Sequence, residues 1–234
     1  MTKKKDTDNR QININDGNYA ESIGRDYVHI NAYYNSSRKE AVFPTVCKNQ
    51  EGLTEYLENI TNKLKQKFGF IEFTQNIIDG NNTIRFLARK ANFDMSVGLI
   101  PMRGEAFLIF SEFAEMNFAA LKAYSNQCLN YAKTQANYST VGNAFYNFKI
   151  PNNLCFAVAI VDEIDDQTRK NVQKINPLRD KLDALWYEIP IIYELNNQEL
   201  YFYEKPLDWK DMFTGEIAWK EIREIIQQSL LLKG

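Results

Sequence analysis

The sequence predicts an α+β protein with a mixed, largely antiparallel sheet flanked by helices and a short strand-like appendage at the N-terminus. Residues 11–35 alternate apolar and polar residues at period two, which favours extended strand over helix. Residues 41–234 alternate amphipathic helical patterns with pairs of strand patterns, which is typical of a sheet with covering helices. Hydrophobic residues make up 44% of the 234 residues, which is enough for a packed core.

The N-terminal segment, residues 11–35, is rich in Asn and Tyr and is interrupted at Gly17 and Gly24. It is too short to form a core by itself, so its strands are expected to pair elsewhere in the fold or with another chain. Residues 1–10 are charged and predicted to be disordered, and the stretch up to residue 40 is predicted to be a linker. The residues expected to mediate association are Ile12, Ile14, Tyr19, Ile23, Tyr27, Val28, Ile30 and Tyr33.

Residues 41–234 are predicted to form a single domain whose helices follow from apolar residues at helical spacing. Helices are predicted at 53–68, ending at Gly69, and at 114–136, 165–175, 178–186 and 216–232. Strands are predicted at 70–74, 83–90, 93–100, 105–110, 154–161, 189–195 and 200–204, with turns at 79–82, 101–104 and 196–199. The run 154–161 is apolar throughout, so we expect it to be covered on both faces.

The predicted order of helix, antiparallel strands, helix and buried strand over residues 51–162 is similar to the core of the PD-(D/E)xK restriction-endonuclease-like fold. That resemblance implies a Mg²⁺ ion held by an Asp on the second strand and by the Glu of a Glu-x-Lys on the third. Asp94 and Glu105 stand at matching positions, but Phe107 stands where the lysine belongs, and Glu112 is not followed by a lysine either. The departure favours an inactive scaffold over an active nuclease.

The N-terminal segment also resembles short Asn/Gly/Tyr strand segments at the front of bacterial signalling and defence proteins, notably near STAND-type NTPases. In those proteins the segments are thought to bring chains together. The NTPase itself has no counterpart here, because the sequence contains no Gly-x-x-x-x-Gly-Lys-Ser/Thr motif. The resemblance therefore implies assembly in a bacterial defence setting.

Other patterns that could carry chemistry have structural interpretations that we favour. His29 is the only histidine and is distant in sequence from Cys47, Cys128 and Cys155, so neither a Cys–His nucleophile nor a zinc site is predicted. The acidic run 162–166 could bind a cation, but helix capping by Asp165 or Asp166 is the favoured interpretation. The aromatic residues between 186 and 219 are interleaved with glutamates, which disfavours nucleic acid and favours a place in the core.

The leading hypothesis is a non-enzymatic association protein, a homo-oligomer or the partner of another protein, without a cofactor or a metal. The alternative is a Mg²⁺-dependent nuclease or an inactive nuclease-like domain that binds nucleic acid. A third hypothesis, a small-molecule sensor with a pocket between sheet and helices, stays open, although no convergent polar group can be named for it. A net charge of −2 argues against a broad nucleic-acid-binding face. With no membrane-spanning apolar run and no secretory signal, a cytoplasmic location is expected.

Overall fold

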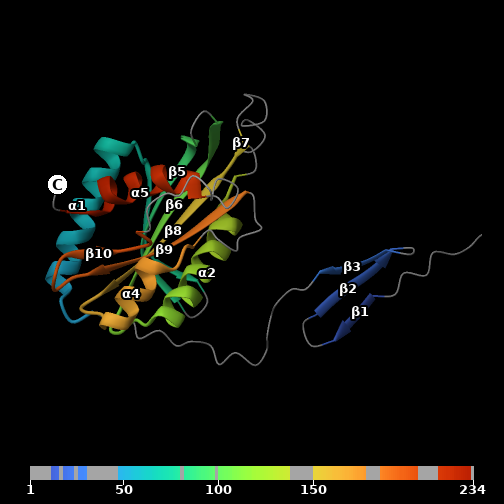
Figure 1. Cartoon of the computed structure of the whole chain (residues 1–234), viewed down its shortest axis with the longest axis horizontal. Coiled ribbons are helices and arrows are strands. Elements are labelled where there is room, and N and C mark those ends of the chain that lie inside the picture. The colour runs from blue at the N-terminus through green and yellow to red at the C-terminus, as the bar shows by residue number, and fades with distance from the viewer. Residues whose placement is uncertain are drawn as a thin grey trace, which may run out of the picture. The chain divides into compact units, whose positions relative to one another are not determined.

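The computed structural model describes residues 12–15, 18–23, 26–30, 47–79, 82–97, 100–137, 150–177, 185–204 and 216–232. The chain divides into two compact units, Met1–Ala41 and Val42–Gly234 (Figure 1). The predicted tail 1–10, residues 31–35 of the strand-like segment and the linker 36–40 lie outside the described residues.

The N-terminal unit contains a three-stranded antiparallel sheet in the order β1-β2-β3. The strands are β1 (Ile12–Asn15), β2 (Asn18–Ile23) and β3 (Asp26–Ile30). Extended structure is thus confirmed, but the expectation that the strands must find partners outside the segment is wrong, because they pair with each other. Only two residues separate each strand from the next, and this spacing suits hairpin pairing.

The larger unit is built on one mixed sheet in the order β10-β9-β8-β6-β5-β4, with β7 beside β6. The pairs β4–β5, β5–β6 and β9–β10 are antiparallel, whereas β6–β8, β8–β9 and β6–β7 are parallel. The α+β class with a mixed sheet flanked by helices is therefore confirmed. The strands are Glu72–Asp79 (β4), Asn82–Val97 (β5), Ile100–Phe113 (β6), Ile150–Pro151 (β7), Asn153–Val161 (β8), Trp186–Glu194 (β9) and Glu199–Tyr201 (β10).

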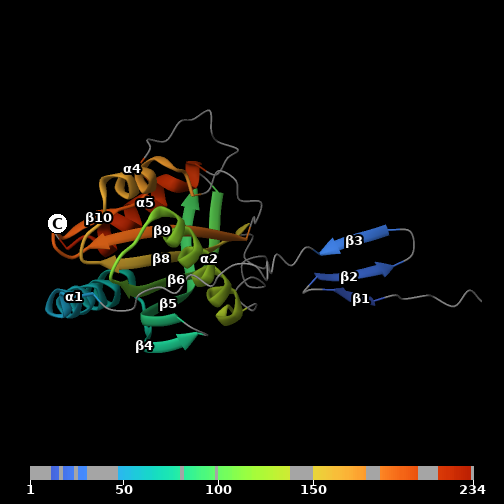
Figure 2. The same cartoon turned by 90° about the horizontal axis from the view of Figure 1, so that it is seen from below.

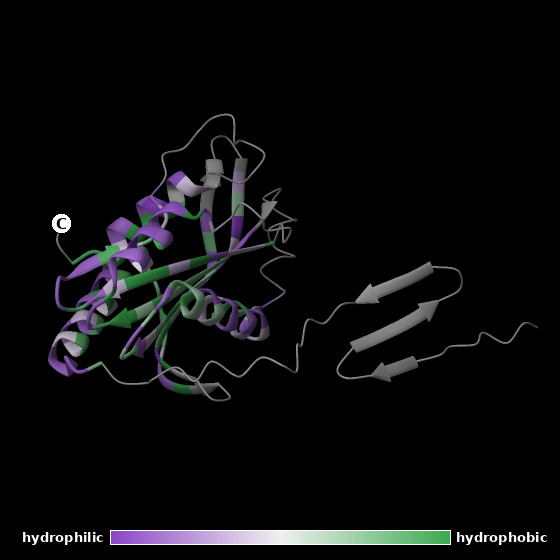
Figure 3. Ribbon diagram, turned by 60° about the horizontal axis from the view of Figure 1, so that its bottom comes forward, coloured by the Kyte–Doolittle hydropathy of each residue, from purple (hydrophilic) through white to green (hydrophobic). Residues whose placement is uncertain are grey.

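Helices cover both faces of this sheet (Figures 1 and 2). One face packs against α1 (Gln50–Phe68) and α5 (Glu216–Leu230), and the other against α2 (Phe118–Gln135) and α4 (Asp166–Lys174). Figure 3 shows hydrophobic residues concentrated on strands in the middle of the unit, while hydrophilic residues colour much of the helices. None of the described helices is long and apolar enough to cross a membrane.

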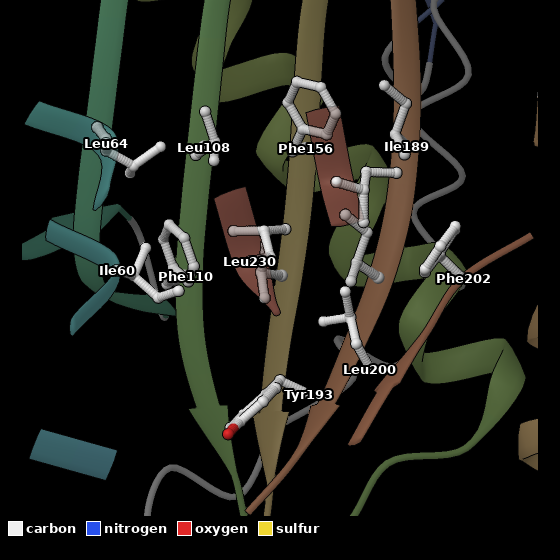
Figure 4. Close-up of a cluster of buried hydrophobic side chains, with 14 of the residues drawn as sticks. Ile60, Leu64, Leu108, Phe110, Phe156, Ile189, Tyr193, Leu200, Phe202 and Leu230 are labelled. Carbon is white, nitrogen blue, oxygen red and sulfur yellow. The ribbon is translucent and has the colours of Figure 1, made fainter. Parts of the chain in front are cut away.

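The core between the sheet and the pair α1 and α5 is apolar and closely packed. Figure 4 shows Ile60 of α1, Phe110 of β6 and Leu230 of α5 in one cluster, and all three are fully buried. Every residue of β8 is buried, which confirms the prediction for residues 154–161. Burying such large side chains contributes roughly 1.5–3 kcal/mol each, so these two layers hold the unit together.

The structure corrects the strand predictions between residues 70 and 113. It has three strands here where four were predicted, because β5 runs on through Val97 with a register shift between Lys90 and Phe93. Residues 101–104, predicted as a turn, lie inside β6, where Met102 pairs with Met95. Asn92 adopts a φ of 56° at the register shift, so a single bulged residue stands where the sequence suggested a break between strands.

Two helix predictions also change. The predicted helix 114–136 begins only at Phe118, because the Asn117 side chain caps it by accepting from the Ala120 N–H. In the predicted helix 178–186, residues 178–184 lie outside the described residues, and Trp186 opens strand β9. The first helix ends as predicted at Gly69, whose φ of 64° is left-handed.

Candidate functional site

The register of the N-terminal sheet places most of the expected association residues on one face. Ile14, Tyr19 and Ile30 lie opposite one another across the three strands, and Glu21 pairs with both Ile12 and Val28. Because successive residues of a strand alternate between faces, six of the eight expected residues share one face. These six are Ile12, Ile14, Tyr19, Ile23, Val28 and Ile30. Tyr27 belongs to the opposite face, and Tyr33 lies outside the described residues.

The opposite face of the N-terminal sheet is polar. Its positions are occupied by Asn13, Asn15, Asn18, Ala20, Ser22, Tyr27 and His29. The sheet is therefore amphipathic, with two short outer strands, β1 and β3, that each pair with β2 on one side only. Outer strands of this kind can accept a further strand along their other edge.

Asp94, the first carboxylate of the nuclease hypothesis, is held by an arginine on the neighbouring strand. The Arg103 Nε and Nη2 atoms donate to the two carboxylate oxygens of Asp94 over 2.7 and 2.6 Å. These hydrogen bonds raise the pKa of Arg103 above its ordinary value. The pair lies across β5 and β6 in direct register, so it joins the two strands.

Glu105, the second carboxylate, is buried and engaged by other groups. The Arg89 Nε and Nη2 atoms donate to its Oε2 over 2.9 and 2.7 Å, and the Asn137 N–H donates to its Oε1 over 2.7 Å. Asp94 and Glu105 are thus each bound by their own arginine. Among the described residues, no group of three His, Cys, Asp or Glu residues is placed to hold a metal ion.

Three further carboxylates stand at or beside the carboxyl ends of the parallel strands and bind backbone N–H groups. Glu112 of β6 accepts from the Cys47 N–H over 3.2 Å, and Asp162 after β8 accepts from the Lys48 N–H over 2.7 Å. Glu194 of β9 accepts from the Ile164 N–H over 3.1 Å. Because these N–H groups precede α1 and α4, the carboxylates fasten the beginnings of both helices to the sheet.

The acidic run behaves as the capping interpretation predicts. Asp165 accepts from the N–H groups of Gln167 and Thr168 over 2.9 Å each and so caps α4. The side-chain hydrogen bond from Thr168 is the main cause that lowers the pKa of Asp165. The run therefore satisfies the first turn of a helix.

The three cysteines are buried in the core, and so are several of the described aromatic residues from Trp186 onward. The Cys47 thiol is fully buried and donates to the carbonyl oxygens of Phe113 and Ile160 over 3.3 Å each. Burial raises the pKa of this thiol to about 12, so it stays protonated and is a poor nucleophile at neutral pH. Cys128 and Cys155 are buried too. The buried aromatic residues from Trp186 onward are Trp186, Tyr193, Tyr201, Phe202, Tyr203 and Trp219.

A groove of about 520 Å³ lies between α1 and the β4–β5 pair, at residues that the sequence did not single out. Arg85 and Asn76 form part of one wall, and α1 forms the other. A lone arginine and an asparagine in a strand pattern carry no signal for a site, because only the pairing of β4 with β5 brings them together.

No protein-family model, curated protein or solved structure matches the chain.

Proposed function

We propose that this chain is a non-enzymatic association protein that assembles with copies of itself through β1, β2 and β3. The observation that carries the proposal is the register of that sheet, which gathers six of the expected association residues on one face, with Glu21 and Asp26 as the charged residues among them. A three-stranded sheet of short strands needs such a face to be covered in order to be stable. Resemblance of the segment to those of bacterial defence proteins supports the same role.

The design of the larger unit supports a partner outside this chain. Its sheet already has α1 and α5 on one face and α2 and α4 on the other. Every residue of β8 is buried, so the middle of that sheet needs no further covering layer. A second copy supplies both an apolar face and free strand edges of matching length.

Light scattering of the purified full-length chain tests this proposal. We expect a mass above that of the monomer for the full chain and the monomer mass for a shortened chain of residues 42–234. Substituting Ile14→Lys with Ile30→Lys should return the full chain to a monomer, because two charges would enter the shared apolar face.

The matched control is Asn13→Lys with His29→Lys, which adds the same charge to β1 and β3 on the polar face. This variant should keep most of the assembly. A full-length chain that stays monomeric at high concentration would contradict the proposal. Equal loss of assembly in both double variants would instead assign the contact to the strand edges alone.

The order of elements favours nuclease-like nucleic-acid processing as a second candidate. Helix α1 is followed by the antiparallel strands β4, β5 and β6, then by α2 and by β8 parallel to β6. If this role is correct, Asp94→Ala with Glu105→Ala should abolish Mg²⁺-dependent cleavage of DNA or RNA, while Glu163→Ala, at an exposed position, leaves it intact. Absence of cleavage by the unaltered protein with Mg²⁺ would remove an active nuclease from consideration.

A further inference from the structure

The groove between α1 and the β4–β5 pair contains an arginine that is held in place from two sides. Arg85 Nε lies 3.0 Å from Oε1 of Glu112, and Arg85 Nη1 donates to Oδ1 of Asn76 over 3.1 Å. Glu112 is itself anchored by the Cys47 N–H and by the Gln50 side chain. The guanidinium is therefore oriented before any ligand arrives, which lowers the entropy cost of binding.

Arg85 differs from the other arginines of the larger unit that form described ion pairs. Terminal nitrogens of Arg89, Arg103 and Arg169 contact carboxylates, namely those of Glu72 and Glu105, of Asp94, and of Asp166 and Glu194. The described ion pair of Arg85 uses Nε alone. Nη1 donates one of its two hydrogens to Asn76. The Arg85 side chain is about one-third exposed, and its Nη2 together with the second hydrogen of Nη1 can bind an oxyanion with two parallel hydrogen bonds.

Asn76 adds a second, independent feature at the same place. Its φ of 52° is left-handed, although it lies within β4, and the ladder pairs on either side of it are Gln75–Phe86 and Ile77–Ile84. Asparagine tolerates this region better than other non-glycine residues, but the conformation is unusual inside a strand, and such positions cluster at binding sites. Here the residue with this backbone is the one whose side chain orients Arg85.

The α1 wall of the groove offers acceptors. The hydroxyls of Thr54 and Thr61 donate back to the carbonyl oxygens of Gln50 and Leu57 over 2.9 and 2.6 Å, so toward the groove they can only accept. The exposed carboxylate of Glu58 on the same wall is an acceptor as well. The groove thus has a cationic donor, Arg85, on the sheet side and three acceptors on the helix side, with the amides of Asn62 and Gln75 able to donate or accept.

We propose that this groove binds a small hydroxylated oxyanion, that is, a hydroxycarboxylate or the phosphate ester of a polyol. The carboxylate or phosphate binds the terminal nitrogens of Arg85, and hydroxyl groups of the ligand donate to Thr54, Glu58 and Thr61. A groove of about 520 Å³ has ample room for a molecule of this size. This ligand site is separate from the strand association proposed above.

Calorimetric titration of the full-length protein with succinate, malate, inorganic phosphate and glycerol 3-phosphate tests the proposal. The hydroxylated member of each pair should bind with a Kd of about 1 mM or tighter, several times more tightly than the bare anion. Comparison of the malate and glycerol 3-phosphate arms shows whether a carboxylate or a phosphate is preferred. Arg85→Lys keeps the positive charge but removes the two terminal guanidinium nitrogens that donate in parallel, so it should weaken binding about tenfold.

Matched variants separate the site from general effects. Arg103→Lys changes an arginine outside the groove, and Asn92→Gly relieves a left-handed φ of 56° away from it, so both should bind like the unaltered protein. Asn76→Gly relieves the same kind of strain but removes the partner of Arg85, and it should weaken binding. Circular dichroism confirms that each variant is folded. No binding of any of the four probes, or equal loss in Arg85→Lys and Arg103→Lys, overturns the proposal.

Discussion

At the scale of single residues, Gly104 shows how closely the backbone segments approach one another. A Cβ atom at this position in β6 would lie 1.5 Å from the carbonyl oxygen of Asn152 and 2.9 Å from Oδ1 of Asn153. Asn153 also accepts from the Glu105 N–H over 2.8 Å, so the crossing segment is fixed there. Only glycine leaves room for this contact.

Gly104→Ala is therefore expected to destabilise the protein by roughly 3 kcal/mol, because backbone atoms must move apart. Urea unfolding followed by circular dichroism measures the change. Gly69→Ala is the matched control: its added Cβ meets nothing nearer than Lys90 Nζ at 3.7 Å, and only the left-handed φ opposes it. That variant should lose about 1 kcal/mol. If both variants lose the same free energy of unfolding, the added Cβ atom at Gly104 is accommodated without a further cost in stability.

The two carboxylates of the nuclease hypothesis are bound by arginines whose pairing with them could not be predicted from the sequence. Asp94 and Glu105 lie on adjacent strands, as the sequence suggested, but Arg103 and Arg89 bind them. The sequence shows both arginines, yet their partners depend on the pairing of β5 with β6 across the register shift. Period-two alternation alone could not place that shift.

At the scale of elements, the fold relies on carboxylates that tie helices to strand ends. Glu194 at the end of β9 shows this best. It accepts from the Ile164 N–H before α4 and from the Tyr201 hydroxyl of β10, and it lies 3.5 Å from Arg169 of α4. One side chain thus joins a strand, its hairpin partner and a helix.

The environment of Glu194 predicts a loss of stability in acid. Burial acts to raise the pKa of Glu194, but hydrogen bonds from Asn197, Tyr201 and Ile164 and the charge of Arg169 together hold it below its usual value. A lowered folded-state pKa contributes stability above the unfolded-state pKa, about 4.3 for Glu. That contribution disappears as the pH falls through the folded-state value.

Glu194→Gln should accordingly lower the free energy of unfolding at pH 7 and make it less dependent on pH below about pH 4. Thermal unfolding across a pH series measures both effects. Glu163→Gln, at an exposed position of the loop between β8 and α4, should leave the curve unchanged. If the stability of Glu194→Gln falls in acid as steeply as that of the unaltered protein, groups other than Glu194 cause the acid sensitivity.

Element predictions were most accurate where local chemistry decides the outcome. The end of α1 at Gly69, the cap at Asp165 and the apolar strand β8 follow from backbone freedom, side-chain capping and burial on two faces. The element predictions failed where pairing with a strand distant in the sequence determines the structure. Residues 101–104 contain Pro and Gly and suggest a turn, but pairing with β5 keeps them extended.

At the scale of the whole molecule, two units have different designs. The larger unit has two buried apolar layers of its own, with helices on both faces of its sheet. The N-terminal sheet is small and has an apolar side that must be covered for the sheet to be stable. We infer that another copy of the chain covers it. Association and ligand binding are thereby proposed for different units of one chain.

The sequence by itself determined the α+β class, most helices and strands of the larger unit, and the extended, amphipathic character of the N-terminal segment. These features depend on the period of apolar residues and on capping chemistry, which act locally. Only the tertiary structure decided the sheet order, the length of β5, the arginine partners of Asp94 and Glu105, and the meeting of Arg85 with Asn76 beside α1. Those outcomes depend on contacts between residues distant along the chain, for which one sequence carries no periodic signal.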